Sequence, residues 1–389
     1  MIDKIANAFR LLTPALFIGY AVYANASLFL SDETTLHGTS ERSLLEGGLT
    51  REFEEIYKTS LPHREPAVGL LGAARYLTLG VGKKGVVVGN DDWFFTEEEF
   101  GPNVNSEPLI ARSVAEITAI RNELDSHNIK LVLVPLPQKS DIYSDQLGTI
   151  SNTTDAISQY RQFVSRLQAQ GVEVIDTRKT MMSAKSEGKV FFKTDTHWTP
   201  LGAQKVAAKI EQKMTLPDGI NSKSFKLFSA EDTRFWGDLV NFVTGNNYGK
   251  LAGLHQEHTQ IWRAEEEVAE NATLDLFGAQ DTFPVVLIGT SYSADTRWSF
   301  AEFLKKDLKA DVLNLAEKAK GPGAPMYAFL QGDVLKDTPP QVVIWEFPTR
   351  YLAQKDIWDT KPQQAKDTPA KTETVDLDLL LKEQSDGHS

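Results

Sequence analysis

The sequence predicts an α/β protein, in which helices cover both faces of a mostly parallel sheet. Several short apolar runs lack the alternation of half-exposed strands, which is typical of strands buried on both faces. Segments with helical apolar spacing separate these runs, as expected when parallel strands are joined by crossover helices. Two polar motifs also lie where strands give way to helices, and ligand sites of such sheets lie beyond the carboxyl ends of the strands. The expected strands are 130–135, 172–175, 283–288, 311–315 and 341–345.

A lead-in helix and a β-hairpin are expected before the α/β part. Phe53, Ile56 and Tyr57 are spaced i, i+3 and i+4, which indicates a helix over residues 49–59. Two β-rich runs flank the turn residues of 89–92 and predict a hairpin. The main helices are expected at 108–126, 154–169, 200–213 and 298–309.

Two stretches depart from the strand–helix alternation. Residues 215–270 are rich in Gly, Asn, Asp and aromatic side chains without a helical period, so we expect an irregular insertion of loop and short strand. The chain from residue 354 is rich in Lys, Asp, Thr and Pro and is expected to be disordered, with a docking helix or a frayed end at 375–382. The expected division is a targeting segment 1–31, a catalytic domain 32–353 and a tail 354–389.

The N-terminus predicts export. Residues 11–31 carry no charge, while Lys4 and Arg10 precede them. About 20 apolar residues can span a bilayer, and the positive flank stays inside. The body is therefore expected outside the cytoplasm, in the periplasm, tethered to the inner membrane by an uncleaved signal anchor. Ala24-Asn25-Ala26 also matches a cleavage site, so a removed signal peptide is the alternative, and a buried soluble helix is a third.

Composition excludes several classes of protein. The formal net charge of −12 argues against a nucleic-acid binder, because phosphate binding requires clustered Lys and Arg. A polyanionic substrate would need a local basic patch. The absence of cysteine excludes thiolate catalysis, disulfides and Cys-ligated metal sites.

Asp195 and His197 form the first candidate site. Side chains at i and i+2 of an extended segment lie on the same side, so the carboxylate can orient the imidazole. Thr199 and Pro200 follow as an N-cap and first helical residue, which places the pair where a helix begins.

Ser291 supplies the second candidate site. It follows an apolar strand and a Gly-Thr turn, where a sharp bend exposes a hydroxyl. A serine is a weak nucleophile until a base takes its proton, and a carboxylate fixes that base, so Ser291, His197 and Asp195 fit the three roles. The alternatives are a helix cap at Ser291 and a structural hydrogen bond at Asp195. Asp-x-His is also a metal-ligand spacing, but no companion histidine motif exists, so neither metal nor cofactor is expected.

Further residues are candidates for substrate binding. Gly321 is a possible second oxyanion donor or an ordinary turn glycine. Arg297, Arg350 and Tyr351 follow strand ends and either hold substrate or lie on the surface. Trp198 is expected as a wall of the acceptor groove, with core packing as the alternative.

Several blocks in one order resemble a known family. These blocks are TDTHWTPLGA, LIGTSYSAD, DVLNLA, GPGAPM and WEFPTRYL, with the earlier KKGVVVGNDDWFF and LVLVPLPQKSDIY. Together they resemble the alginate O-acetyltransferase AlgJ/AlgX family of SGNH-hydrolase-like proteins. The resemblance covers roughly residues 45–353. It implies an SGNH-type α/β/α sandwich with a Ser-His-Asp triad and a permuted order, since Asp-x-His precedes the serine. Without a carbohydrate-binding domain after residue 353, and with an N-terminal anchor, the chain is more similar to the AlgJ branch.

The resemblance also implies a function. Family members acetylate an exported polysaccharide, alginate in particular, in the periplasm, and receive acetyl groups from a membrane-bound O-acyltransferase. A periplasmic SGNH carbohydrate esterase and a non-catalytic scaffold of an export complex are the alternatives. The acidic charge leaves open whether the chain binds a polyuronate itself or relays acetyl to another subunit.

Overall fold

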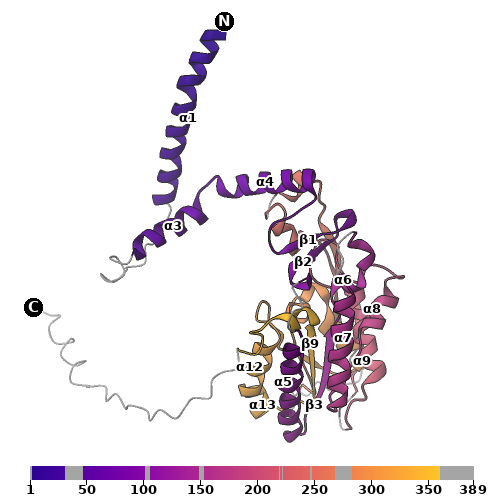
Figure 1. The fold of residues 1–389 in the computed structure, drawn as a ribbon. Coiled ribbons are helices and arrows are strands. Elements are labelled where there is room, and N and C mark those ends of the chain that lie inside the picture. The colour runs from indigo at the N-terminus through magenta and orange to yellow at the C-terminus, as the bar shows by residue number, and fades with distance from the viewer. Residues whose placement is uncertain are drawn as a thin grey trace, which may run out of the picture.

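A five-stranded parallel sheet forms the centre of the protein (Figure 1). The computed structural model describes residues 2–30, 47–100, 106–148, 153–218, 220, 222–245, 248–267 and 283–359. The strand order is β4-β3-β9-β7-β8, and every neighbouring pair is parallel, which confirms the predicted fold class. The strands are β3 (Lys130–Leu136), β4 (Glu173–Val174), β7 (Val285–Ile288), β8 (Val312–Asn314) and β9 (Val342–Pro348).

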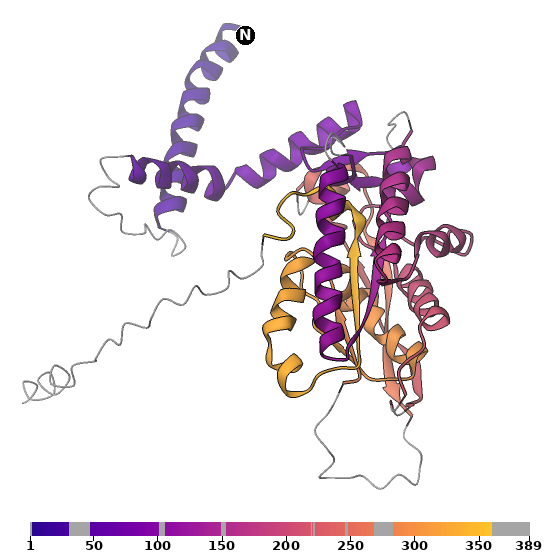
Figure 2. The same cartoon turned by 60° about the horizontal axis from the view of Figure 1, so that its bottom comes forward.

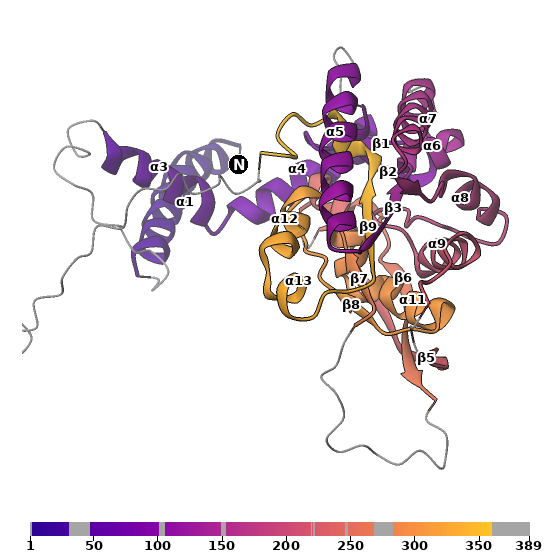
Figure 3. The ribbon, with the colours of Figure 1, turned by 90° about the horizontal axis from the view of Figure 1, so that it is seen from below.

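Helices cover both faces of this sheet, and the strand residues alternate between two cores. In β3, Leu131 and Leu133 join one core while Val132 and Val134 join the other. Helices α5 and α12 lie on one side of the sheet and α9 and α11 on the other (Figure 3). The first core is shared with α5 (Ser106–Ser126), α7 (Thr153–Ala169), α12 (Gly323–Gln331) and α13 (Asp333–Asp337). The second is shared with α8 (Arg178–Ala184), α9 (Pro200–Lys213) and α11 (Phe300–Leu308).

Helix α9 begins where the sequence predicts. The Thr199 side chain accepts a hydrogen bond from the Gly202 N–H at 3.3 Å, and Pro200 occupies the first helical position. Val206 and Ile210 are fully buried against the sheet. The start of this helix therefore fixes the end of the loop that carries Asp195 and His197.

The insertion is more regular than predicted. Instead of loop and short strand, 215–270 contains a long antiparallel ribbon of β5 (Phe225–Phe235) and β6 (Glu257–Glu266). Much of β5 is exposed and polar, and a register shift between Ser229 and Glu231 interrupts its period, so apolar alternation is weak. Two 3₁₀ helices, η4 (Asp238–Phe242) and η5 (Gly249–Ala252), lie between the strands.

The N-terminal part contains the predicted helix and hairpin. Helix α3 (Gly48–Ser60) matches the predicted 49–59, and β1 (Val86–Val88) pairs with β2 (Phe94–Thr96). Helix α4 (Arg64–Leu79) was not predicted. Helix α1 (Ile2–Phe29) stands apart from the sheet-containing body (Figure 2). In the ranges described here, no helix combines the length and apolar character needed to cross a bilayer, and export stays a prediction.

The C-terminal boundary lies later than predicted. Residues 354–359 are not a free tail, because Ile357 and Trp358 are buried in the core next to α5. The Trp358 Nε1–H donates to Ser113 Oγ at 3.0 Å. The rest of the expected tail, including 375–382, lies outside the described residues.

Candidate active site

A sharp turn after β7 presents Ser291. The strand ends at Ile288, and Gly289 and Thr290 lead directly into the short helix α10 (Ser291–Ala294). The Thr290 side chain accepts a hydrogen bond from the Tyr292 N–H and caps this helix. Ser291 is partly exposed, whereas Tyr292 is buried. The turn thus holds one hydroxyl at the surface between buried neighbours.

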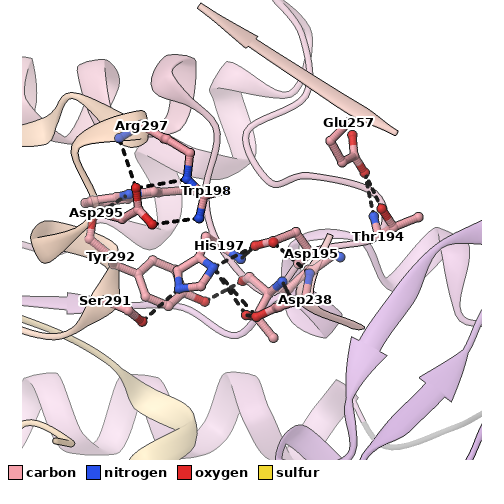
Figure 4. Close-up of polar contacts among 12 residues, drawn as sticks. Thr194, Asp195, His197, Trp198, Asp238, Glu257, Ser291, Tyr292, Asp295 and Arg297 are labelled. Atoms are coloured by element: carbon pink, nitrogen blue, oxygen red, sulfur yellow. Dashed lines mark hydrogen bonds and ion pairs between the residues drawn. The ribbon is translucent and has the colours of Figure 1, made fainter. Parts of the chain in front are cut away.

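The loop before α9 places the predicted carboxylate and imidazole together (Figure 4). Asp195 Oδ1 lies 2.6 Å from His197 Nδ1 and also accepts the His197 backbone N–H at 2.8 Å. The second carboxylate oxygen accepts the Asp238 N–H at 2.9 Å. Both oxygens of the buried carboxylate are therefore fixed, and His197 is held with Nε2 pointing away from Asp195.

His197 Nε2 lies 2.7 Å from Ser291 Oγ, although the two residues are 94 positions apart in the chain. Burial lowers the pKa of His197, but the Asp195 charge and hydrogen bond raise it by more, so the net shift is upward. Burial raises the pKa of Asp195, and the His197 charge with several hydrogen bonds lowers it by more. The carboxylate is kept ionised, and the imidazole can take a proton from the hydroxyl.

Asp238 is a further member of the site that the sequence did not indicate. Its carboxylate accepts hydrogen bonds from the Thr196 N–H at 2.8 Å and from the Thr196 hydroxyl. One of its oxygens lies 3.8 Å from His197 Nδ1. Asp238 begins a 3₁₀ helix of the insertion, where no periodic pattern marks it, so only the tertiary structure brings it to the loop.

Asp195, His197 and Asp238 also form a cluster of the kind that can hold a metal. Two ligands of one tetrahedral zinc ion would lie about 3.3 Å apart, given metal–ligand distances of roughly 2.0–2.1 Å. The 2.6 Å separation of His197 Nδ1 and Asp195 Oδ1 is shorter and fits a shared proton. The donors as arranged fit a hydrogen-bonded relay better than a metal centre.

Two buried charged residues, Lys139 and Glu257, hold the loop that carries Asp195 and His197 from the side of the core. The Lys139 Nζ donates to the carbonyl of Asp195 at 2.9 Å and to those of Lys193 and Phe94 at 3.0 and 2.5 Å. Burial lowers its pKa to about 8. Glu257 of β6 accepts hydrogen bonds from both the N–H and the hydroxyl of Thr194. The ribbon and the segment that follows β3 therefore both fix the loop.

Glu346 lies beneath the turn that carries Ser291. Its fully buried carboxylate accepts hydrogen bonds from the Ser293 hydroxyl at 2.7 Å and from the Thr290 N–H and hydroxyl at 3.2 Å each. A Cβ at Gly289 would meet Glu346 Oε2 at 2.6 Å, so the turn leaves no room for a side chain there. Burial raises the pKa of Glu346 to about 7.

The expectation that Trp198 lines an acceptor groove is wrong. Its side chain is fully buried, and its ring packs against Phe300. The indole N–H donates to the Tyr292 carbonyl at 2.9 Å. Because its side chain points into the core, Trp198 links the loop of His197 to the turn that carries Ser291.

The other predicted substrate-binding residues differ in their surroundings. Arg350 is buried and donates to the Tyr292 hydroxyl at 2.9 Å, so it supports the site from within. Tyr351 is partly buried, with its ring 5.0 Å from the Arg350 guanidinium. Gly321 has φ +67° in the turn before α12, and in the described part of the chain no hydrogen bond joins it to Ser291. The Arg297 guanidinium packs on the Trp298 ring, and that ring in turn stacks on the His197 imidazole.

A family model for an SGNH hydrolase-like domain, the acetyltransferase AlgX, matches residues 86–349. The chain belongs to this AlgJ/AlgX family. It is 33% identical over 362 residues to a probable alginate O-acetylase AlgJ of Pseudomonas syringae pv. tomato, covering 92% of each chain. It is 34% identical to the protein of the same name from Pseudomonas aeruginosa, covering 80% of this chain and 82% of that one.

A solved structure agrees with the sequence comparison. The O-acetyltransferase domain of Pseudomonas putida AlgJ matches with a TM-score of 0.62 and 35% identity, over 70% of this chain and 93% of that domain. Pseudomonas aeruginosa AlgX matches less well, with a TM-score of 0.56 and 26% identity over 75% of this chain and 69% of that one. The predicted SGNH-like fold and the greater similarity to the AlgJ branch are thereby confirmed.

Proposed function

We propose that this family member is a serine O-acetyltransferase that acetylates an exported polysaccharide, alginate in particular. The observation that carries the proposal is the continuous relay Asp195–His197–Ser291, with separations of 2.6 and 2.7 Å. The names of its AlgJ relatives support acetyl transfer to alginate.

The reaction proceeds in two half-reactions. His197 takes the Ser291 proton as Oγ attacks the acetyl carbonyl of the donor, and it returns this proton to the leaving group. Acetyl-Ser291 then reacts with a sugar hydroxyl whose proton passes to His197 and on to Ser291 Oγ. The Ser291 backbone N–H donates to no protein acceptor within the described ranges, which suits it to stabilise the oxyanion.

The donor and the location follow from the same proposal. A membrane-bound O-acyltransferase supplies acetyl groups to the chain outside the cytoplasm, in the periplasm, where the N-terminal segment directs it. The extended family resemblance and the uncharged stretch 11–31 support this part of the proposal.

Replacing the nucleophile tests the reaction. Ser291→Ala removes the acyl-accepting oxygen, so we expect release of p-nitrophenol from p-nitrophenyl acetate to fall by at least about 1,000-fold. Transfer of acetyl to a mannuronate oligosaccharide, followed by mass spectrometry, should be lost as well. Treatment with a chelator serves as the control and should leave wild-type turnover intact.

The outcomes separate the alternatives. Wild-type protein that releases acetate but never acetylates the oligosaccharide would be an esterase. Normal polymer acetylation in cells that carry Ser291→Ala would indicate a scaffold. Loss of activity on chelation would instead favour a metal bound by Asp195, His197 and Asp238.

A further inference from the structure

We propose that Arg297 and Lys318 form a specificity-determining pair that binds a carboxylate of the acetyl acceptor, so that this chain itself selects an acidic sugar. The inference rests on the acetyl transfer proposed above. It concerns the rim of the site, where two cations lie next to the turn that carries Ser291.

A buried carboxylate holds both cations. The Asp295 carboxylate accepts hydrogen bonds from Arg297 Nε and Nη2, at 3.0 and 2.7 Å, and from Lys318 Nζ at 2.8 Å. Its side chain is only 7% exposed. Burial raises the pKa of Asp295, but the hydrogen bonds and charges of the two cations keep it well below its usual range. Asp295, Arg297 and Lys318 taken alone carry a net charge of +1, and the charges of Asp195 and Asp238 also act on Arg297.

Aromatic rings fix the orientation of the guanidinium. The Arg297 Cζ lies 4.6 Å from the ring centres of both Phe235 and Trp298. Trp298 is fully buried and stacks on His197 with a centroid distance of 5.3 Å and an interplanar angle of 27°. The positive charge is therefore held next to a ring that itself packs on the catalytic base. A cation fixed in this way loses little conformational freedom when it binds an anion.

Lys318 reaches the same place from the neighbouring strand. It follows β8, and the adjacent Glu317 N–H donates to the Gly289 carbonyl at 3.1 Å, beside the turn of Ser291. The Lys318 and Arg297 side chains are 58% and 35% exposed, so a ligand can reach them. Exposed cations of this kind attract an anion to the side of the turn that carries Ser291.

The chemistry of the pair matches a uronic acid. A carboxylate accepts charge-assisted hydrogen bonds from guanidinium and ammonium groups, whereas a neutral sugar offers them only uncharged hydroxyl oxygens. Each sugar of a polyuronate carries both a carboxylate and free hydroxyl groups. Binding its carboxylate can therefore orient one of its hydroxyls toward acetyl-Ser291. The expected preference for an acidic over a neutral acceptor is about 10-fold or more.

The test compares two acceptors that differ at one group of each sugar, a carboxylate in one and a neutral hydroxymethyl group in the other. Purified full-length protein transfers acetyl from p-nitrophenyl acetate to a mannuronate oligosaccharide, or to the same oligosaccharide with its carboxyl groups reduced to alcohols. We expect Arg297→Gln and the double variant with Lys318→Met to raise KM for the acidic acceptor about 10-fold, while KM for the reduced acceptor changes little. Arg297→Lys, which keeps the charge, should restore part of the preference.

A matched control removes the same charge elsewhere. Arg234 is exposed on the ribbon strand β5, and Arg234→Gln should leave the preference between the two acceptors as in the wild type. If circular dichroism shows that Arg297→Gln is not folded, the Lys318→Met variant alone gives the same comparison between the two acceptors.

Two results overturn the inference. The first is a wild-type protein that does not discriminate between the acceptors, and the second is a preference that persists in the double variant. In either case acetyl transfer that depends on Ser291 still stands, so the failure of this inference is distinct from that of the proposed function. Ester hydrolysis through Ser291 with no transfer to either acceptor overturns both.

Discussion

Each residue of the Ser-His-Asp relay depends on atoms outside it. Asp195 is fixed by the backbone of Asp238, and the loop of His197 is held by Lys139 and Glu257. Without such contacts a carboxylate next to an imidazole would have several orientations, because exposed pairs are weakly held. The supporting residues therefore decide whether a short Asp-x-His pattern becomes a catalytic base.

The buried carboxyl group of Glu346 predicts that stability depends on pH. Its pKa of about 7 lies above the value of about 4.3 in an unfolded chain, so the folded state binds the extra proton between these values. The contribution of this group to stability is thus fully present below about pH 4.3 and is lost as pH rises through about 7. It amounts to roughly 4 kcal/mol between these limits, from about 1.36 kcal/mol per pKa unit.

The variant Glu346→Gln removes this titration while keeping the shape. An amide oxygen can accept from Thr290 N–H and Ser293 Oγ–H, and the amide nitrogen can donate to Thr290 Oγ1. Urea unfolding at pH 5 and pH 8 should show a smaller loss of stability in the variant than in the wild type. Glu211→Gln, on the exposed side of α9, is the control. Parallel pH dependence in wild type and Glu346→Gln would contradict the assigned protonation.

At the scale of elements, the insertion is part of the site. The segment between β5 and η4 passes so close to the catalytic loop that a Cβ on Gly237 would lie 2.2 Å from the Thr194 carbonyl oxygen. The insertion also supplies Asp238, at the start of η4, and Glu257, at the start of β6. The ribbon therefore packs against the loop of Asp195 and supports it.

Gly237→Ala should uncouple these two elements. The clash is with backbone, so no rotamer relieves it, and the ribbon or the loop must shift. We expect esterase activity to fall at least about 10-fold and stability by about 1–3 kcal/mol. Gly188→Ala is the matched control, because its nearest neighbour at 3.1 Å is the end of the Leu201 side chain. Equal effects of the two substitutions would show that the ribbon does not position the loop.

Export is a prediction for the whole molecule. If residues 2–30 direct the body out of the cytoplasm, a reporter enzyme that needs disulfide bonds should be active when fused after residue 359. The same fusion without residues 2–30 should be inactive. An active fusion that lacks these residues, or an inactive full-length one, would contradict the periplasmic location.

Local sequence patterns were sufficient to predict the sheet strands, the main helices and the Asp195–His197 pair. These features depend on neighbours a few positions apart, so apolar runs, helical spacing and an N-cap at Thr199 suffice to predict them. The sequence also marked Ser291 as a residue at a strand end, because a Gly-Thr turn follows an apolar run.

Which distant residues meet depends on how the chain folds in three dimensions. Ser291 reaches His197 across 94 positions, and Asp238 comes from a segment without a periodic pattern. Trp198 follows His197 directly, yet it is buried, because the bridge between Phe191 and Trp198 turns its ring into the core. Long-range packing sets such contacts, and it depends on the order of strands in the sheet, which local spacing does not encode.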